Sequence, residues 1–496
     1  MVEQPDDGNG PARVVIVGGG LAGLELARHL DVAGVDGVVV VEAGPDGDRR
    51  HVNAVHDPGA ALDMWLDSDT AADLWRPWES ATPPFYTRHG GLRRRLGGRS
   101  LYWHGVILPI EPWALASPPW PATVVTDLTE SWNGGPGLYE RVSDDLARWR
   151  SEVPAPPPPP PLTVAGWRLQ PTPKALRPAG RAGWEAYSPL SYWTTPGRAP
   201  STRFRTDARV LGVLVDDGRA VGVRVVDGAG HTGDVRCDTV VLAAGTIENS
   251  RLAIQARHDV GVSSGSELSG LADHIEQGIM VVLDVDRLPP AIAELALADS
   301  SHQMPVAGSR TRLFTRFYPL TGSDGKRVVL EAFATGEQVS DSYASVRCRV
   351  DARWPWPTTV HAGLSPADRD VVEEGRRILT AFWQDLAALV GLPPGDVSFP
   401  SFDDPDRTVA DVLLGLGGDV EVGTPTGWCS LLGTVDHEGG TLPVGGLLDE
   451  RQEFRDIRGL YAVGPSTFAR SGAANPSLTT LALSRRLAGL LAKALP

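Results

Sequence analysis

The stretch that decides the fold is RVVIVGGGLAGLELARHLDVAGVDGVVVVEAG, residues 13–44. The apolar run 14–17 is typical of a buried parallel strand, and it leads directly into Gly18, Gly20 and Gly23 in G-x-G-x-x-G spacing. A second apolar run, 38–41, ends at Glu42. The order of strand, glycine turn, helix, strand and acidic residue predicts a dinucleotide-binding unit.

Each glycine of this motif has its own expected role. Gly18 permits the tight turn, Gly20 leaves no side chain between the backbone and a pyrophosphate, and Gly23 lets the helix lie close on the strand. The phosphates would then meet unpaired N–H groups at the positive end of the helix dipole, and Glu42 would accept hydrogen bonds from ribose hydroxyls. A glycine motif by itself is more often a simple turn. Its flanking elements favour the dinucleotide interpretation here, without deciding between FAD and NAD.

Composition limits the partners of the chain. The 496 residues are 42% hydrophobic, enough for a large core and for two or three domains. A formal net charge of -15 argues against a nucleic acid or an anionic membrane as partner, although it permits a local basic site. The polar amino-terminal segment has no apolar leader, and no segment reaches the length of a membrane span, so we expect a cytoplasmic protein.

The cysteines carry no metal or disulfide pattern. Cys237, Cys348 and Cys429 are odd in number and spaced for neither purpose, so we expect reduced thiols in the core and no metal site.

The middle of the chain predicts a change of architecture. Residues 1–12 are expected to be disordered, residues 203–226 alternate as in a β-meander with a turn at Asp217 and Gly218, and residues 239–245 form a strand that runs into a glycine. Residues 276 to 422 carry no nucleotide signature. Strand-like runs at 280–285, 327–334 and 343–350 accompany a helix over 365–390, so we expect a second domain.

That helix has clear end signals and one apolar face. Ser365 is the expected N-cap and Gly391 the stop. The residues expected to face inward are Ile378, Phe382, Leu386 and Leu389.

A second glycine-rich stretch, GLRRRLGGRSLYWHGV at residues 91–106, contains three successive rings. The pair Gly97 and Gly98, then Ser100, then Tyr102, Trp103 and His104 indicate backbone packed against a flat ligand. A glycine-rich loop over a core edge is the alternative. Farther on, SEVPAPPPPPP at residues 151–161 predicts a stiff, exposed polyproline II loop.

The last sixty residues hold the candidate chemistry. His437 lies in the glycine-rich segment GTVDHEGGTLPVG, residues 433–445. Asn475 precedes Pro476, which predicts Asn475 as N-cap and Pro476 as the first residue of a terminal helix with Leu478, Leu481 and Leu487 turned inward. The amino end of a helix carries positive potential. If it points at a ligand edge that becomes negative on reduction, it favours acceptance of a hydride by that ligand. Taken singly, a residue such as His437 is more often an ordinary loop histidine, and one such as Asn475 is more often a simple cap.

Together these stretches resemble the glucose-methanol-choline (GMC) oxidoreductase family of FAD enzymes. Four segments match in family order: the loop 18–23 with Glu42, LGGRSLYWHG from Leu96, VVLAAGTIENSRL at 240–252, and HEGGTLPVG with AANPSLT. LADH at 271–274 resembles a further short family element. The resemblance implies FAD as cofactor and covers about half of the chain, the half that would bind it.

The implied fold class is α/β plus α+β, with a Rossmann-like FAD-binding domain and a second antiparallel-sheet domain for the substrate. We assign residues 13–150, 200–275 and 423–496 to the discontinuous FAD-binding domain. Residues 151–199 and 276–422 are assigned to the substrate-binding domain.

The resemblance also assigns roles. His437 matches the catalytic histidine, which accepts the hydroxyl proton of an alcohol, and Asn475 matches the second catalytic position, which holds the oxygen while hydride leaves for flavin N5. The residues expected to contact FAD are Gly18, Gly20, Gly23, Glu42, Gly97, Gly98, Ser100, Tyr102, Trp103, His104, Ala244, Gly245, Gly464 and Pro476.

Two positions depart from the family pattern. Tyr102 stands where some relatives have a histidine bonded covalently to the flavin, so dissociable FAD is expected, with His104 as the alternative link. Gly464 and Pro465 stand where an acidic residue near the pyrophosphate is usual.

The substrate expected from this pattern is a sugar, glycoside or other polyhydroxylated alcohol. The 15 tryptophans and the GG-x-S-x-x-W segment, similar to sugar-oxidising relatives, favour it. Basic residues are almost all arginine, with Lys174, Lys326 and Lys493 the only lysines, which indicates a GC-rich bacterial source. The alternatives are an FAD-containing non-redox lyase of the same fold, a natural-product tailoring alcohol dehydrogenase or oxidase, and a non-enzymatic flavin-binding protein. An NAD-dependent dehydrogenase would leave the terminal segments without a role.

Overall fold

The computed structural model of the chain describes residues 12–56, 60, 64, 71–87, 90–180, 183–195, 200–262, 265–320, 323, 325–338, 343–403, 407–415 and 421–495. The prediction of disorder over residues 1–12 lies, except for the last residue, outside the described part of the chain.

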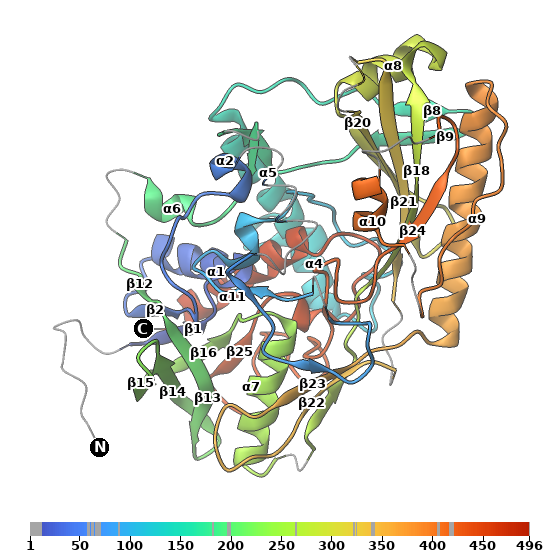
Figure 1. Cartoon of the computed structure of the whole chain (residues 1–496). Coiled ribbons are helices and arrows are strands. Elements are labelled where there is room, and N and C mark those ends of the chain that lie inside the picture. The colour runs from blue at the N-terminus through green and yellow to red at the C-terminus, as the bar shows by residue number, and fades with distance from the viewer. Residues whose placement is uncertain are drawn as a thin grey trace.

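A parallel sheet of five described strands occupies one half of the molecule (Figure 1). Its order is β12 (Arg203–Arg205), β2 (Val38–Val41), β1 (Val14–Val17), β16 (Thr239–Leu242) and β25 (Leu460–Ala462). Strands β1, β2 and β16 are buried at every position, because parallel strands are covered on both faces. The predicted strands at 14–17 and 38–41 are confirmed. Residues 203–205, predicted as part of the meander, pair with β2 instead.

Helices pack against this sheet and against one another. They are α1 (Leu21–Val32), α4 (Ala122–Thr129), α5 (Leu138–Ser151), α7 (Thr246–Asp259) and α11 (Ser477–Ala494). A buried ion network joins three of them: Glu25 of α1 pairs with Arg485 of α11 at 2.6 Å, and Arg485 pairs with Asp145 of α5 at 2.5 Å. The terminal helix is thereby tied to the first helix of the chain.

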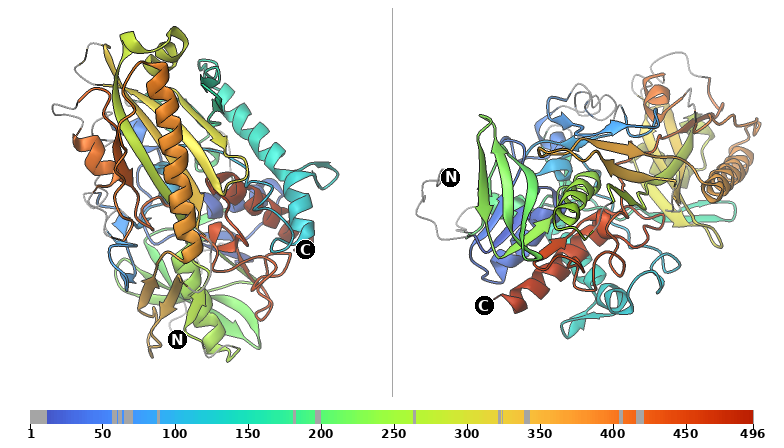
Figure 2. Two further views of the ribbon diagram at one scale, coloured as in Figure 1. Left: turned by 90° about the vertical axis from the view of Figure 1, so that its right-hand side faces the viewer. Right: turned by 90° about the horizontal axis from the view of Figure 1, so that it is seen from below.

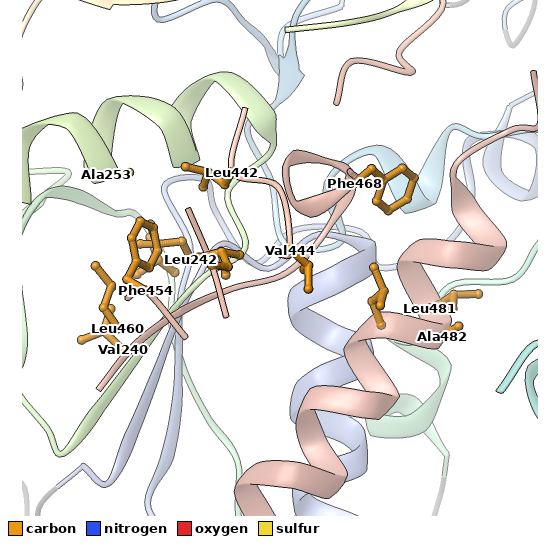
Figure 3. Packing of buried hydrophobic residues seen from close by; sticks show 14 of the residues in the cluster. Val240, Leu242, Ala253, Leu442, Val444, Phe454, Leu460, Phe468, Leu481 and Ala482 are labelled. Carbon is orange, nitrogen blue, oxygen red and sulfur yellow. The ribbon is translucent and has the colours of Figure 1, made fainter. Parts of the chain in front are cut away.

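The core of this half draws on both ends of the chain. Figure 3 shows Val240 and Leu242 of β16 near Leu442, Val444 and Leu460 from the carboxyl-terminal region, and Leu481 and Ala482 of α11 nearby. Each of these side chains is fully buried. The carboxyl-terminal segments are therefore part of the same core as the amino-terminal unit.

The predicted meander forms a separate antiparallel sheet beside this core. It consists of β13 (Ala208–Asp216), β14 (Arg219–Asp227) and β15 (Thr232–Arg236). The turn between the first two strands lies at Asp217 and Gly218, as predicted.

The other half of the molecule contains an antiparallel sheet of seven described strands. Its order is β24 (Thr426–Cys429), β18 (His274–Asp284), β21 (Arg327–Glu337), β20 (Thr311–Pro319), β19 (Ser301–Pro305), β9 (Trp167–Pro171) and β8 (Leu162–Val164). The long helix α9 (Pro366–Leu389) runs along one face of this sheet, and α8 (Pro290–Leu297) lies at its end (Figures 1 and 2).

Helix α9 begins as predicted. Ser365 accepts a hydrogen bond from the N–H of Asp368, whose carboxylate accepts from the N–H of Ser365 in a capping box. The helix ends at Leu389 with Val390 as its C-cap, and Gly391 follows with a φ of +67°, as expected for the residue after a helix end. Ile378, Phe382 and Leu386 are buried, but the prediction for Leu389 is wrong: it is 45% exposed. Ala387 and Val390 of the same turn are buried against the sheet, so Leu389 lies at the uncovered edge of the apolar face.

Smaller elements complete the described chain. A four-stranded sheet contains β17 (Glu267–Ser269), β22 (Ser345–Cys348), β23 (Thr358–His361) and β4 (Glu79–Ser80), so the strand predicted at 343–350 is shorter than expected. Three two-stranded pairs are β3 (Leu74–Trp75) with β5 (Leu92–Arg93), β6 (Ser131–Trp132) with β7 (Gly135–Pro136), and β10 (Leu176–Pro178) with β11 (Trp184–Ala186). The short helices are α2 (Val52–Val55), η2 (Gly98–Leu101), α6 (Ser191–Thr194), η3 (Val285–Arg287), α10 (Val409–Gly415) and η4 (Pro465–Thr467).

The predicted fold class, a Rossmann-like parallel sheet with a second antiparallel sheet, is confirmed. The domain boundaries stay a prediction; strand β24, assigned above to the FAD-binding part, pairs with β18 of the antiparallel sheet. All three cysteines are buried free thiols, as expected. Among the described helices, none combines the length and apolarity needed to cross a lipid bilayer.

Candidate active site

A cavity of about 970 Å³ lies between the two halves of the molecule. It opens at the carboxyl ends of the parallel strands, the position at which α/β sheets bind ligands, and extends to the face of the antiparallel sheet. The site residues predicted from sequence that line it are Gly18, Gly20, Glu42, Gly98, Ser100, Tyr102, Trp103, His104, Ala244, Gly245, His437, Gly464, Asn475 and Pro476. Gly23 and Gly97 lie behind this lining.

The first glycine turn has the geometry that its spacing predicts. Gly18 has φ +107°, and a Cβ atom there would lie 2.5 Å from the carbonyl oxygen of Ala243. A Cβ on Gly23 would lie 2.0 Å from the oxygen of Gly18, so this glycine lets α1 lie against the strand. Gly20 faces open space, because a Cβ atom there would have no other atom within 4 Å. It is also the N-cap of α1 and provides no side-chain cap, so the first N–H groups of the helix are available to a ligand.

Glu42 lies at the end of β2 with its carboxylate held by the backbone. Its two oxygens accept hydrogen bonds from the N–H groups of Gly19 at 2.9 Å and Gly44 at 2.8 Å. Burial raises the pKa of Glu42 to about 7, although these backbone donors act in the opposite direction. The carboxyl group is fixed at the cavity wall where a ribose would lie.

The second glycine loop packs directly on the first. The N–H of Gly97 donates to the oxygen of Gly19 at 2.8 Å, and a Cβ on Gly98 would lie 3.3 Å from the Cα of Gly20. Ser100 is turned away from solvent and bonds the Gly97 oxygen and the Ser188 hydroxyl, both at 2.7 Å. The two loops therefore form one cradle, although about eighty residues separate them in the sequence.

The three rings that follow have different surroundings. Tyr102 donates its hydroxyl to Asp73 at 2.5 Å, and the guanidinium of Arg93 lies over its ring at 4.2 Å. The Trp103 indole donates to the oxygen of Tyr187 at 2.8 Å. Burial, together with nearby positive groups, holds the pKa of His104 well below its usual value, so this imidazole is neutral.

The segment 240–252 forms a third part of the cavity lining, beside the two glycine loops. Gly245, with φ +85°, is the N-cap of α7 and lines the cavity with Ala244. Asn249, one turn into the helix, accepts from the N–H of Ala244 at 2.8 Å and donates to Ser466 Oγ at 3.0 Å. This buried amide joins the end of β16 to the segment after β25, which contains Gly464.

The loop with His437 is clamped on both sides. Ala272 and Gly439 exchange backbone hydrogen bonds at 3.0 and 2.8 Å, and Leu442 N–H donates to Ser466 at 2.7 Å. The N–H of Gly433 donates to Asp273 at 2.6 Å. Such fixation keeps the imidazole in one place at the cavity wall.

Arg99 connects this loop to the second glycine loop. Its guanidinium lies 2.6 Å from Glu438 and 3.0 Å from Asp436, the two residues that flank His437. It also donates to the oxygen of Gly91 at 2.6 Å. The predicted cofactor cradle and the predicted catalytic loop are thereby one rigid unit.

Asn475 lies before α11, and its side chain contacts His437 directly. Asn475 Nδ2 is 3.1 Å from His437 Nε2. The predicted helix start is wrong by one residue: Pro476 is the N-cap and the helix begins at Ser477. The reason is that the Asn475 side chain bonds the imidazole and is not available to cap the helix. The amino end of α11 is therefore uncapped and opens onto the cavity.

A chain of three hydrogen bonds fixes the proton positions on His437. His274 Nε2 lies 3.0 Å from the oxygen of Gly472, and a carbonyl only accepts, so this nitrogen carries the hydrogen. In neutral His274 the other nitrogen, Nδ1, then accepts from His437 Nδ1–H, 2.8 Å away. The remaining lone pair of His437 is on Nε2, facing Asn475 and the cavity.

The electrostatics agree with this assignment. Burial lowers the pKa of His274 to about 4, so it is neutral at physiological pH. Burial, with His274 and Arg99, holds the pKa of His437 well below its usual value. His437 is therefore a neutral imidazole whose Nε2 can accept a proton.

Sequence reasoning gives no role to two residues that organise this site. His274, in the LADH element, is 163 residues from His437, and Arg99 is 339 residues from Glu438. The signals are present, since LADH resembles a family element and Arg99 lies between Gly98 and Ser100. Their partners could not be read from spacing, because both contacts are between distant segments.

The cavity has the features that a dinucleotide needs. Uncapped amino ends of α1, α7 and α11 open onto it, two glycine loops leave its floor without side chains, and Glu42 lies at the ribose position. Its volume is at the upper end of the range for ligand pockets, about 300–1,000 Å³. The residues present therefore fit FAD.

Solved structures with the same fold include two oxidases. Pyridoxine 4-oxidase from Mesorbium loti is 18% identical, with 97% of this chain and 99% of that chain covered and a TM-score of 0.61. Formate oxidase from Aspergillus oryzae RIB40, for which FAD modification is described, is 14% identical, with 98% and 99% covered and a TM-score of 0.62. No protein-family model and no curated protein sequence matches the chain. The likeness extends over the whole length of both chains and establishes the fold.

Proposed function

We propose that this protein is an FAD-dependent oxidoreductase of the GMC family that oxidises a CH–OH group of a sugar, glycoside or other polyhydroxylated alcohol to a carbonyl. The observation that carries the proposal is the pair His437 and Asn475, which lies at the wall of a cavity whose floor is a dinucleotide cradle. The fold shared with pyridoxine 4-oxidase and formate oxidase supports it.

The cofactor would be held by the cradle described above. Gly20 and Gly98 would leave room for the pyrophosphate, Glu42 would accept from the ribose, and the loop with Trp103 and His104 would hold the ring system. The uncapped end of α11 would supply positive potential to a ring that gains negative charge beside it. Bound FAD supplies the acceptor for the hydride that leaves the carbinol carbon.

His437 and Asn475 perform the proton chemistry. The lone pair of His437 Nε2 accepts the hydroxyl proton, while the amide N–H of Asn475 donates to the same oxygen and holds it in place. His274 accepts from His437 Nδ1–H, so the imidazole can act only through Nε2.

The surroundings of Tyr102 support dissociable FAD. Its hydroxyl is engaged by Asp73 and its ring lies under Arg93, so it has a structural role at the position where some relatives carry the covalent link. A cytoplasmic location and the absence of nucleic-acid and membrane partners stay predictions from composition.

The test is anaerobic mixing of the FAD-loaded protein with a panel of sugars, glycosides and polyols, followed by the absorbance of oxidised flavin. We expect bleaching by at least one member and recovery of the colour when an electron acceptor is added. His437→Ala should keep FAD bound but slow bleaching by about 10²–10⁴-fold. Turnover without bleaching would instead identify a non-redox lyase, and a colourless protein that binds no FAD would contradict the proposal.

A further inference from the structure

A group of charged side chains lines the cavity on the side of the antiparallel sheet, and the reaction described above uses none of them. Arg316 is on β20, Glu331 on β21, Asp299 in the turn before β19, and Lys174 in the segment after β9. The hydroxyl of Tyr318 belongs to the same group. We refer to these five residues as the charged wall.

Lys174 is held beside the loop with Trp103 and His104. The N–H of Ala175 donates to Gly105 at 2.7 Å, and the N–H of Ile107 donates to Pro173 at 3.0 Å, so the two segments run side by side. The Lys174 side chain is half-buried and lines the cavity. Its ammonium makes no hydrogen bond or ion pair with any residue that the structure describes.

The neighbours of Lys174 do not supply a full counter-charge. Arg316 lies over the ring of Tyr318 at 4.3 Å, and its nearest acid, Asp299, is 3.8 Å away, at the outer limit of an ion pair. Glu331 is directly across the strands from Arg316, and its carboxyl group accepts the hydroxyl hydrogen of Tyr318. The cations Lys174 and Arg316 therefore have two acids near them. Asp299 is distant, and Glu331 is already bonded to Tyr318.

The titration behaviour of the wall agrees with a positive local potential. Burial, then Arg316, lowers the pKa of Lys174 to about 7. Burial raises the pKa values of Asp299 and Glu331, which weakens both as counter-ions. Burial and then Arg316 and Lys174 depress the pKa of His104. An enclosed cation without a partner is unfavourable, and a bound anion would relieve it.

We propose that Lys174 and Arg316 bind a carboxylate of the substrate, so that the alcohol oxidised is a hydroxy acid, such as a sugar acid. This inference rests on the proposed function, because the wall belongs to the same cavity as His437. A carboxylate matches the planar guanidinium of Arg316 and carries one negative charge. Asp299 and Glu331 would repel a phosphate ester, which carries about two charges, more strongly than a carboxylate with one.

The test compares neutral alcohols with their carboxylates in matched pairs: D-glucose with D-glucuronate, and 1,2-propanediol with lactate. D-glucose 6-phosphate is included to test whether the site prefers a phosphate ester. Binding to the FAD-loaded protein is measured by calorimetry, and flavin bleaching anaerobically. At least one carboxylate should bind about tenfold or more tightly than its neutral partner, as expected for a charge-assisted hydrogen bond.

Three variants test whether Lys174 is responsible for the higher affinity of the carboxylate. Lys174→Met should remove most of it, Lys174→Arg should keep it, and Lys326→Met, at an exposed lysine, should leave it unchanged. The gain should also fall as pH rises above about 7, where Lys174 loses its proton, while the neutral partner shows no such fall. Because Arg316, His104, Asp299 and Glu331 also face Lys174, the pH effect must disappear in Lys174→Met.

Each outcome decides a separate point. Equal affinity for both members of every pair, a gain that survives Lys174→Met, or tighter binding of the phosphate overturns the inference. Bleaching by neutral sugars alone overturns it and leaves the proposed function intact. Carboxylate binding that depends on Lys174, without flavin bleaching by any compound, supports the carboxylate site alone; it overturns the proposed function and with it the oxidation of a hydroxy acid.

Discussion

The cavity has two ends that are built in different ways. At the parallel-sheet end the wall is mostly backbone: Gly18, Gly20 and Gly98 bring main-chain atoms to the ligand, and helix ends supply the potential. At the antiparallel-sheet end the wall is made of side chains from strands, among them Arg316, Phe314 and Glu331. A backbone wall tolerates little substitution and suits a constant ligand, whereas a side-chain wall can change residue by residue and suits a variable one.

The largest expected effect comes from breaking the backbone end. Gly18→Ala forces a Cβ to within 2.5 Å of the Ala243 carbonyl oxygen at a φ of +107°, so either the turn or the sheet must move. We expect a cost above about 4 kcal/mol and loss of FAD binding, measured by absorbance of the purified protein after dialysis. Gly47→Ala is the control, because it has open space around it and should retain FAD. Normal FAD content in Gly18→Ala would show that this turn is not part of the cradle.

The next largest effect concerns the ion network that holds α1 to α11. Arg485→Leu leaves Glu25 buried without its main partner and should destabilise the protein by about 3–5 kcal/mol, measured from denaturant midpoints. Arg148→Leu removes an exposed ion pair to Asp145 and should cost about 0–1 kcal/mol. Equal losses for the two variants would contradict the importance of the buried pair.

The same network has a pH signature. Burial would raise the pKa of Glu25, but Arg485, with His29 and Arg28, outweighs it and holds the pKa well below its usual value. A depressed carboxyl pKa contributes stability above the unfolded value, near 4.3, and loses it as pH falls through the folded value. Acid unfolding should therefore be shallower in Arg485→Leu than in the unaltered protein.

A smaller effect is expected from a change in the hydrogen-bond chain that joins His274, His437 and Asn475 between the two ends of the cavity. His274→Phe removes the acceptor for His437 Nδ1–H, so the imidazole can adopt the wrong tautomer; flavin reduction should slow by about 10–100-fold with FAD binding unchanged. His274→Asn, which offers an amide oxygen, should recover part of the rate. Because the pKa of His437 lies well below its usual value, the rate should stay constant as pH falls through 6.5 and decline only in stronger acid. A decline that begins at the ordinary histidine pKa would argue against a buried His437 as the base.

The smallest effect is expected on the side-chain end. Phe314 and Phe333 stack at 4.9 Å with an interplanar angle of 6°, and both line the cavity. Phe314→Leu should weaken substrate binding by about 0.5–1.5 kcal/mol while FAD affinity stays constant, measured as KM against flavin content. A loss of FAD in this variant would mean that the two ends are not independent.

The contrast between the ends also explains what the sequence could and could not predict. The cradle was predictable because each requirement is local: the run 14–17, the spacing of Gly18, Gly20 and Gly23, and Glu42 lie within one stretch. The charged wall was not predictable, because Lys174, Asp299, Arg316 and Glu331 come from separate strands and turns whose alignment depends on tertiary pairing.

Two wrong predictions have a similar origin. The neighbouring Pro476 predicts Asn475 as a helix cap, and the cap is absent because His437, 38 residues away, takes the amide. Leu389 fits the helical period but is exposed at the edge of a turn whose other apolar residues, Ala387 and Val390, are buried. In each case the local signal was correct for an isolated segment, and a long-range contact decided the outcome.

The most direct test of the central claim is a crystal structure of the protein loaded with FAD. We predict an isoalloxazine ring beside Trp103 and His104, with its reactive edge facing His437 Nε2 and Asn475 Nδ2 across a space wide enough for one carbinol group, about 3–3.5 Å from each reacting atom. A ring bound elsewhere, or a cavity in which those two side chains point away from it, would contradict the account.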